Sequence, residues 1–272
     1  MDKTITLKNL NLIFFIIMIA VNMLANMLPL GHGNTGAISA NYPNLFTPAP
    51  ITFSIWGVIY LLSAFFIIYQ YGWLDGHMFS EKMVSLIGYW FVISCVMNVG
   101  WIFSWHYEQI WLSMIFMIGL LISLIVITEQ LSPEYIIDKT GITTIPILAK
   151  IAAAAFDVYM GWITAATIAN MSVLLVKLKW TGFGLPPEFW TVVALIAGSL
   201  IAMLFVIVSK NYLAALAIIW AYCGILIKHI SASGFNGKYP LIIAATMVSI
   251  IIIVCTMVIR ILASMNSICD KG

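Results

Sequence analysis

The residues whose chemistry is hardest to reconcile with their surroundings lie in one apolar run, residues 148–176. At about 100° per residue, a helix over this run has two opposed faces. One face carries Tyr159, Trp162, Ala166 and Asn170, and the other carries Lys150, Asp157 and Gly161. Aromatic rings and an amide suit a flat, apolar ligand that is held by stacking and oriented by hydrogen bonds. Because the opposite face holds charges that cannot meet acyl chains, we expect this helix in the middle of a bundle, with helices on both flanks.

The composition indicates an all-α integral membrane protein. Of the 272 residues, 63% are hydrophobic and only 8% are charged, whereas a soluble domain carries roughly 25% charge. The apolar runs are about 20 residues long and do not alternate, which is typical of membrane helices and not of barrel strands. The net charge of +2 is too small to indicate a nucleic-acid partner.

The apolar runs predict about eight transmembrane helices, over residues 10–30, 51–73, 83–105, 110–128, 148–176, 188–209, 212–227 and 240–260. The segment 31–50 is uncharged and rich in Gly, Asn and Pro, so it is a candidate lid over a pocket mouth. The corner at Lys210 is so short that the sixth and seventh helices must be antiparallel neighbours.

Three other predicted helices carry one-sided stripes of polar or aromatic residues: Asn22 with Asn26, Trp56 with Tyr60, and Asn98 with Trp101 and Trp105. Amides at this spacing either join helices by hydrogen bonds or line a ligand cavity. The aromatic stripes either pack helices together or form a stacking surface for a ligand. The sequence leaves both alternatives open.

Catalytic and metal-binding motifs are missing from the sequence. It contains no H-E-x-x-H, G-x-S-x-G, P-loop or C-x-x-C-H motif, and its four histidines fall in predicted loops or at helix ends. No general base is evident on the aromatic face, so porphyrin breakdown is the weakest of the functions considered. We therefore expect no enzyme activity, no metal site and no required cofactor.

Three blocks resemble the tryptophan-rich sensory proteins, relatives of the mitochondrial translocator protein (peripheral benzodiazepine receptor). The first block, F-T-P-A-P at residues 46–50 with Phe53, Trp56 and Tyr60, is similar to the entry to the family's second helix. The second, Asn98-Val-Gly-Trp101, is similar to the N-x-x-W of the third helix. The third, Tyr159-x-x-Trp162 with Asn170, resembles the Y-x-x-W…N of the fifth. The blocks occur in the family's order.

The resemblance implies a five-helix bundle over residues 1–178, often a homodimer, whose cavity binds porphyrins and similar hydrophobic ligands and is closed by the first loop. The implied lining residues are Trp56, Tyr60, Asn98, Trp101, Tyr159, Trp162 and Asn170. The chain departs from the family pattern at Ala49, where the family has a second proline, and at Val158, often a proline. The proline-to-Trp56 interval also appears one residue short. The Tyr of the cholesterol-recognition motif is missing before Lys177, so sterol binding is not supported.

Three further helices, over residues 186–264, lie beyond the region of resemblance and offer a cover for Asp157. A carboxylate at the membrane centre costs about 2.5–3.5 kcal/mol on insertion scales. We expect the three helices to supply its polar partner, with Tyr222, Ser199, Thr246 and Ser249 as candidates. Lys150 lies about 10 Å away along the helix, so it snorkels to the interface instead. Small residues on the same side, Ala153, Gly161 and Ala165, would allow close packing.

The predicted function is reversible binding of a planar, tetrapyrrole-like molecule for sensing or transfer. The alternative is a small proton-coupled secondary transporter in which Asp157 is the coupling group. With both termini in the cytoplasm, seven or eight Lys and Arg residues face inward and four face outward, which favours this orientation. Eleven Lys against one Arg suggest a bacterial genome, and hence the bacterial cytoplasmic membrane.

Overall fold

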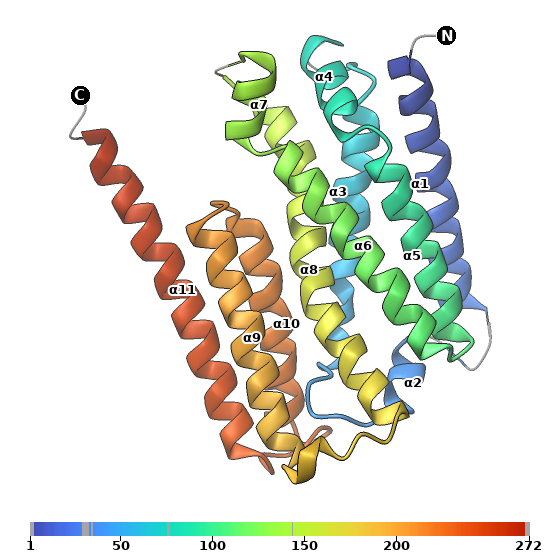
Figure 1. Cartoon of the computed structure of the whole chain (residues 1–272), viewed down its shortest axis with the longest axis vertical. Coiled ribbons are helices and arrows are strands. Elements are labelled where there is room, and N and C mark those ends of the chain that lie inside the picture. The colour runs from blue at the N-terminus through green and yellow to red at the C-terminus, as the bar shows by residue number, and fades with distance from the viewer. Residues whose placement is uncertain (1–2, 29–32, 34, 75–76, 143, 270–272) are drawn as a thin grey trace.

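The computed structural model describes the chain except for residues 1–2, 29–32, 34, 75–76, 143 and 270–272, and it leaves the side chain of Asn26 undescribed. The described elements are the helices α1 Lys3–Met27, α2 Thr35–Ala40, α3 Ile55–Tyr69, α4 His77–Ile87, α5 Trp90–His106, α6 Ile110–Gln130, α7 Pro133–Thr140, α8 Ile147–Lys177, α9 Pro187–Ile207, α10 Tyr212–Ile230 and α11 Pro240–Cys269, with 3-10 turns at Pro50–Ser54 and Gly182–Gly184. Figure 1 shows the long helices running alongside one another, with the start of α1 and the end of α11 at the same end of the molecule.

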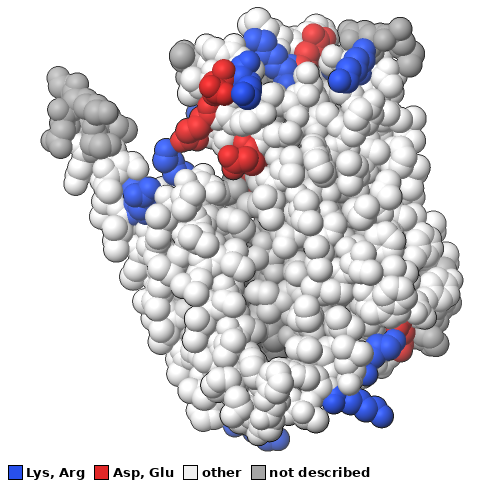
Figure 2. All heavy atoms as spheres, in the orientation of Figure 1, with Lys and Arg blue, Asp and Glu red and all other residues white. Residues whose placement is uncertain are grey.

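The chain is an all-α integral membrane protein. Within the described ranges, seven helices are long and apolar enough to cross a membrane, and the bent pair α4–α5 makes up to eight. Figure 2 shows Lys, Arg, Asp and Glu gathered toward the two ends of the molecule, with a broad uncharged band between them. Such a band is what the hydrocarbon core of a bilayer requires.

The predicted third helix is not continuous. The structure divides the region into α4 and α5, which are bent by 57°. The break falls at Gly88, whose φ is +56°, a left-handed conformation that glycine adopts without steric cost. Two segments predicted as loops also contain short helices, α2 in the first loop and α7 between α6 and α8.

Helix α8 lies in the middle of the bundle, as its two-sided sequence predicts. It packs against α3 and α6 on one side and against α10 on the other. On the α10 side, Gly161 lies directly against the backbone carbonyl of Ala214, so closely that a Cβ atom at position 161 would collide with it. The small residue therefore permits the close helix approach that the sequence predicts.

The C-terminal helices do supply the polar partner of Asp157, but not from the residues that were expected. Asn211, in the turn between α9 and α10, donates from Nδ2 to Asp157 Oδ1 at 2.6 Å. Tyr222, Ser199 and Thr246 instead donate to backbone carbonyls, and no bond from Ser249 to Asp157 is found among the described residues. The prediction was wrong because α9 ends and α10 begins beside Asp157, so a turn faces the carboxylate where helix faces were expected. Lys150 is exposed at the start of α8.

Replacing Gly161 with valine should separate α8 from α10. We expect Gly161→Val to lower the free energy of unfolding by about 1–3 kcal/mol, the usual cost of overpacking, and so to lower the melting temperature in detergent. Gly57→Val is the matched control, because a Cβ atom at Gly57 has no neighbour within 4 Å. Equal melting temperatures for the two variants would contradict this account of the α8–α10 contact.

Candidate ligand-binding site

The indole of Trp56 lies at the centre of an aromatic cluster formed by α3, α5 and α8. It stacks on Tyr60 and on Trp101, with ring centroids 5.5 and 6.2 Å away. It also lies edge-on to Tyr159 and Trp162, at 5.6 and 6.3 Å. The helical spacings read from the sequence therefore do place these five rings together.

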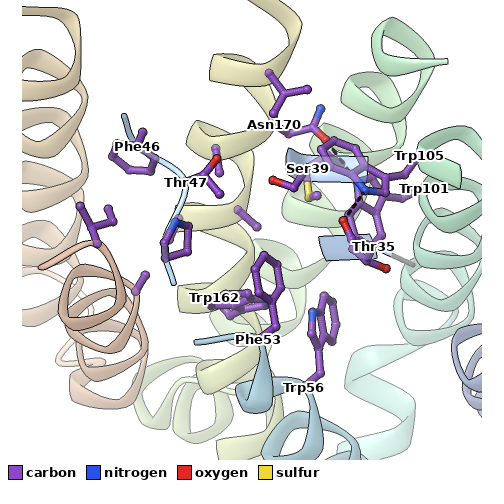
Figure 3. Close-up of a pocket in the computed structure, with 18 residues that line it drawn as sticks. Thr35, Ser39, Phe46, Thr47, Phe53, Trp56, Trp101, Trp105, Trp162 and Asn170 are labelled. Atoms are coloured by element: carbon purple, nitrogen blue, oxygen red, sulfur yellow. Dashed lines mark hydrogen bonds between the residues drawn. The ribbon is translucent and has the colours of Figure 1, made fainter. Parts of the chain in front are cut away.

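Two neighbouring cavities open beside this cluster. The outer chamber, about 490 Å³, lies between α1, α2, α3 and α5; the inner chamber, about 50 Å³, lies between α5, α8, the first loop and α10. Both are lined by Thr35, Phe53, Trp56 and Trp101, so the two chambers adjoin across the same rings. Figure 3 shows the inner chamber, with Phe53, Trp56 and Trp162 on one side and the first-loop residues Phe46 and Thr47 across from Asn170.

Most of the predicted lining residues border one or both chambers, and two of them border neither. Asn22 and Tyr60 line the outer chamber, Trp162 and Asn170 line the inner one, and Trp56 and Trp101 line both. Asn98 and Tyr159 line neither chamber. The side chain of Asn26 lies outside the described residues.

Asn98 and Tyr159 belong to a buried hydrogen-bond chain behind the rings. Asn22 Nδ2 donates to Asn98 Oδ1, and Asn98 Nδ2 donates to the Tyr159 hydroxyl, both at 2.7 Å. This chain joins α1, α5 and α8. A second link runs from Trp101 Nε1 to Asn170 Oδ1 at 3.3 Å, and Asn170 is also bonded to Ser113 of α6. Both alternatives left open by the sequence are therefore realised: the same stripes join helices and border the cavities.

One polar group at the cavity has no protein partner. The indole Nε1 of Trp162 is buried and makes no hydrogen bond within the described part of the chain. A buried N–H donor without an acceptor is costly, by about 1–3 kcal/mol. Trp162 lines the inner chamber, so a ligand with an acceptor atom could satisfy it there.

The first loop is held against α10 by three hydrogen bonds that the sequence did not reveal. Ala49 N donates to Gly224 O at 3.0 Å, Trp220 Nε1 donates to Thr52 O at 2.8 Å, and His229 Nε2 bonds to Leu45 O at 2.9 Å. The departure at Ala49 has a direct structural meaning here, because a proline at this position would have no N–H to donate.

Helix α10 also forms part of the inner chamber, through Ala221 and Ile225. Gly224 lies directly against Thr52, which brings α10 onto the start of α3. The hydrogen bonds between α10 and the segment before α3 could not be predicted from local sequence patterns, because the bonded residues are 168 and 184 positions apart.

On the other side, the loop is fastened to the α5–α6 turn. The Tyr42 hydroxyl donates to a Glu108 carboxylate oxygen at 2.9 Å, and Lys177, at the end of α8, donates to the Glu108 carbonyl. Burial of Tyr42, together with this hydrogen bond to Glu108, raises the pKa of its phenol to about 12. The first loop therefore borders the inner chamber and is held between two anchors, α10 and Glu108.

A comparison of the sequence with models of protein families identifies the family of this chain. The sequence model of the family described as TSPO-like protein matches residues 8–259. The chain belongs to this family. The matched region extends beyond α8 into α11, so the three C-terminal helices lie within the part that the family model describes. Neither a comparison with curated proteins nor one with solved structures found a match.

Metal chemistry finds no support in the described ranges. Within them, no three His, Cys, Asp or Glu side chains lie close enough together to hold a metal ion. The groups that could hold a ligand are instead aromatic faces, amides and the free indole N–H.

Removing the middle member of the buried chain should destabilise the bundle. We expect Asn98→Leu to leave the Tyr159 hydroxyl without its donor and to cost about 1–3 kcal/mol in the free energy of unfolding. The measurement is thermal unfolding in detergent. Asn266→Leu is the control, because Asn266 is exposed on α11; it should have little effect. A similar loss in both variants would contradict the role given to the Asn22–Asn98–Tyr159 hydrogen bonds.

The Tyr42 phenol should lose its proton at a higher pH than an ordinary tyrosine does. Because its folded-state pKa is raised to about 12 from 10.0, its contribution to stability is complete below pH about 10 and is lost as pH rises through about 12. The tyrosinate absorbance of wild type minus that of Tyr42→Phe should show this midpoint, and Glu108→Gln should lower it. A midpoint near pH 10 in both proteins would show that the contact with Glu108 does not form.

Proposed function

We propose that this membrane protein binds a planar hydrophobic molecule of the porphyrin type, reversibly and without chemical change, for sensing or transfer. The observation that carries the proposal is the Trp162 N–H, which has no partner among the described residues and borders a mostly aromatic and aliphatic chamber. The polar side chains of that chamber are those of Thr35, Ser39, Thr47 and Asn170. The Trp162 N–H has a natural role in orienting a ligand that has few polar atoms.

The dimensions of the site support a ligand of this kind. The outer chamber, about 490 Å³, lies within the range of about 300–1,000 Å³ typical of small-molecule sites, so the body of the ligand belongs there. The inner chamber, about 50 Å³, has room only for a small group of the ligand, which would meet Trp162 beyond the rings that the two chambers share. The stacked faces of Trp56 and Trp101 border both chambers. Flat rings gain more from such faces than a flexible chain does, since aromatic pairs add about 0.5–1.5 kcal/mol beyond area burial.

Membership of the TSPO-like family supports the same class of ligand through the resemblance noted in the sequence. The first loop supports a reversible mode of binding, because it borders the inner chamber and is held by non-covalent contacts: hydrogen bonds and the apolar packing of Leu45 and Phe46 with residues of α9 and α10. We infer that the loop opens to admit or release the ligand.

We further infer a bacterial cytoplasmic membrane with both termini in the cytoplasm. The start of α1 and the end of α11 lie at one end of the molecule. The excess of Lys and Arg in the segments assigned to that end supports the cytoplasmic side.

The test is a titration of the protein with protoporphyrin IX, in which binding is measured by the shift of the porphyrin's Soret absorption band. Absorption is preferred to Trp fluorescence because the variants themselves remove a tryptophan. We expect Trp162→Ala to weaken binding about tenfold or more, equivalent to about 1.4 kcal/mol per factor of ten. Trp162→Phe, which keeps an aromatic ring but removes the N–H, should have an intermediate effect.

Trp111→Ala is the control, because Trp111 is exposed on α6 and lines neither chamber. The proposal fails if wild type does not bind the porphyrin saturably, or if Trp111→Ala weakens binding as much as Trp162→Ala does.

A further inference from the structure

A second cavity, which we call the recess, lies toward the opposite end of the molecule from the first loop. It has a volume of about 470 Å³ and is bordered by α6, α7, α8 and the α9–α10 turn. None of its lining residues lines the inner or outer chamber. The recess is therefore separate from the aromatic site.

The recess exists because the α9–α10 hairpin is short. Its turn lies beside Asp157, the eleventh residue of α8, which is about 15 Å from the start of that helix. Figure 1 shows the hairpin stopping well short of α7 and of the beginning of α8. The space above the turn is left open, with polar turn residues and Asp157 at its floor.

The Asp157 carboxyl group retains hydrogen-bonding capacity toward this space. Its bonded partner among the described residues is the Asn211 amide, at 2.6 Å. The Asn211 Oδ1 accepts from Ala214 N to cap α10, which fixes the orientation of the amide that donates to Asp157. A carboxylate can accept about four hydrogen bonds.

The nearby cations do not neutralise Asp157. Lys210 is paired with Glu134 of α7 at 2.7 Å, and this bond lowers the pKa of Glu134. Lys150 is exposed and forms no ion pair within the described ranges. The acidic lining residues are Asp157, Glu129 and Glu134, against the two lysines, so the charge balance of the recess favours a cation.

The remaining walls are apolar and polarisable. They include Phe79, Met83, Met160 and Phe205. Aromatic faces attract ammonium groups, and methionine adapts to irregular apolar shapes. An anionic amphiphile would meet the Asp157 carboxylate at the floor, and a wholly apolar molecule would leave Asp157 with Asn211 as its hydrogen-bond partner among the described residues.

We propose that the recess is a second binding site, which takes an organic amine with an apolar body and holds its ammonium group against Asp157. Glu134 and Lys210 form the rim, where their ion pair joins α7 to the α9–α10 turn. The site is independent of the porphyrin-type ligand proposed for the aromatic cavity.

The test compares three probes with the same chain length, octylammonium chloride, 1-octanol and sodium octanoate, by calorimetry on the protein in lipid nanodiscs with empty nanodiscs subtracted. Wild type should bind octylammonium saturably and at least about tenfold more tightly than 1-octanol. Asp157→Asn, which preserves the shape of the side chain, should remove this preference.

Asp138→Asn is the matched control, because Asp138 is an exposed acid of α7 that does not line the recess; it should leave octylammonium binding unchanged. The proposal is overturned if wild type binds octylammonium no more tightly than 1-octanol, if octanoate binds more tightly, or if Asp157→Asn binds octylammonium as wild type does. Should Asp157→Asn fail to fold, the comparison of the three probes on wild type decides alone.

Discussion

Everything in this fold depends on α8 having no side that suits lipid. Its aromatic face needs the rings of α3 and α5, and its opposite face needs a partner for Asp157 and a backbone close enough to fit Gly161. In a bilayer, neither need can be met by water. The close contact between Gly161 and the Ala214 carbonyl satisfies the packing requirement, and the Asn211 amide supplies one hydrogen bond to the Asp157 carboxyl group. Asn211 and Ala214 both belong to the α9–α10 hairpin, so this one hairpin contacts both Asp157 and Gly161 on that face of α8.

The two faces also separate two kinds of cavity. Near the first loop, aromatic rings and a few amides border chambers with little charge. Near α7, carboxylates and lysines surround an apolar-walled recess. Figure 2 shows charged side chains toward both ends of the molecule and few across its middle. Helix α8 borders both the inner chamber and the recess, and its lining residues for each come within two positions of one another, at Met160 and Trp162.

Local spacing predicted what depends on a single helix. Each stripe containing Trp56, Trp101 or Trp162 could be predicted because residues three or four positions apart share a helix face, and that rule needs no tertiary information. The bend at Gly88 was less accessible, because a glycine within an apolar run is compatible with a straight helix as well as with a broken one. The partners of Asp157 and of the first loop could not be predicted, since they depend on where a hairpin ends and on contacts across more than 50 residues.

The three hydrogen bonds between the first loop and α10 bear on the time for which a molecule would stay inside. Each such bond contributes about 0.5–1.5 kcal/mol net, so breaking all three costs about 3 kcal/mol, in addition to the apolar contacts of Leu45 and Phe46 with α9 and α10. If the loop opens both to admit and to release a molecule, as proposed, this cost slows entry and exit alike. One of the three bonds depends on Ala49, because a proline there would have no N–H to donate to Gly224. The exchange rate of the ring-lined site would therefore depend on α10, a helix outside the first five.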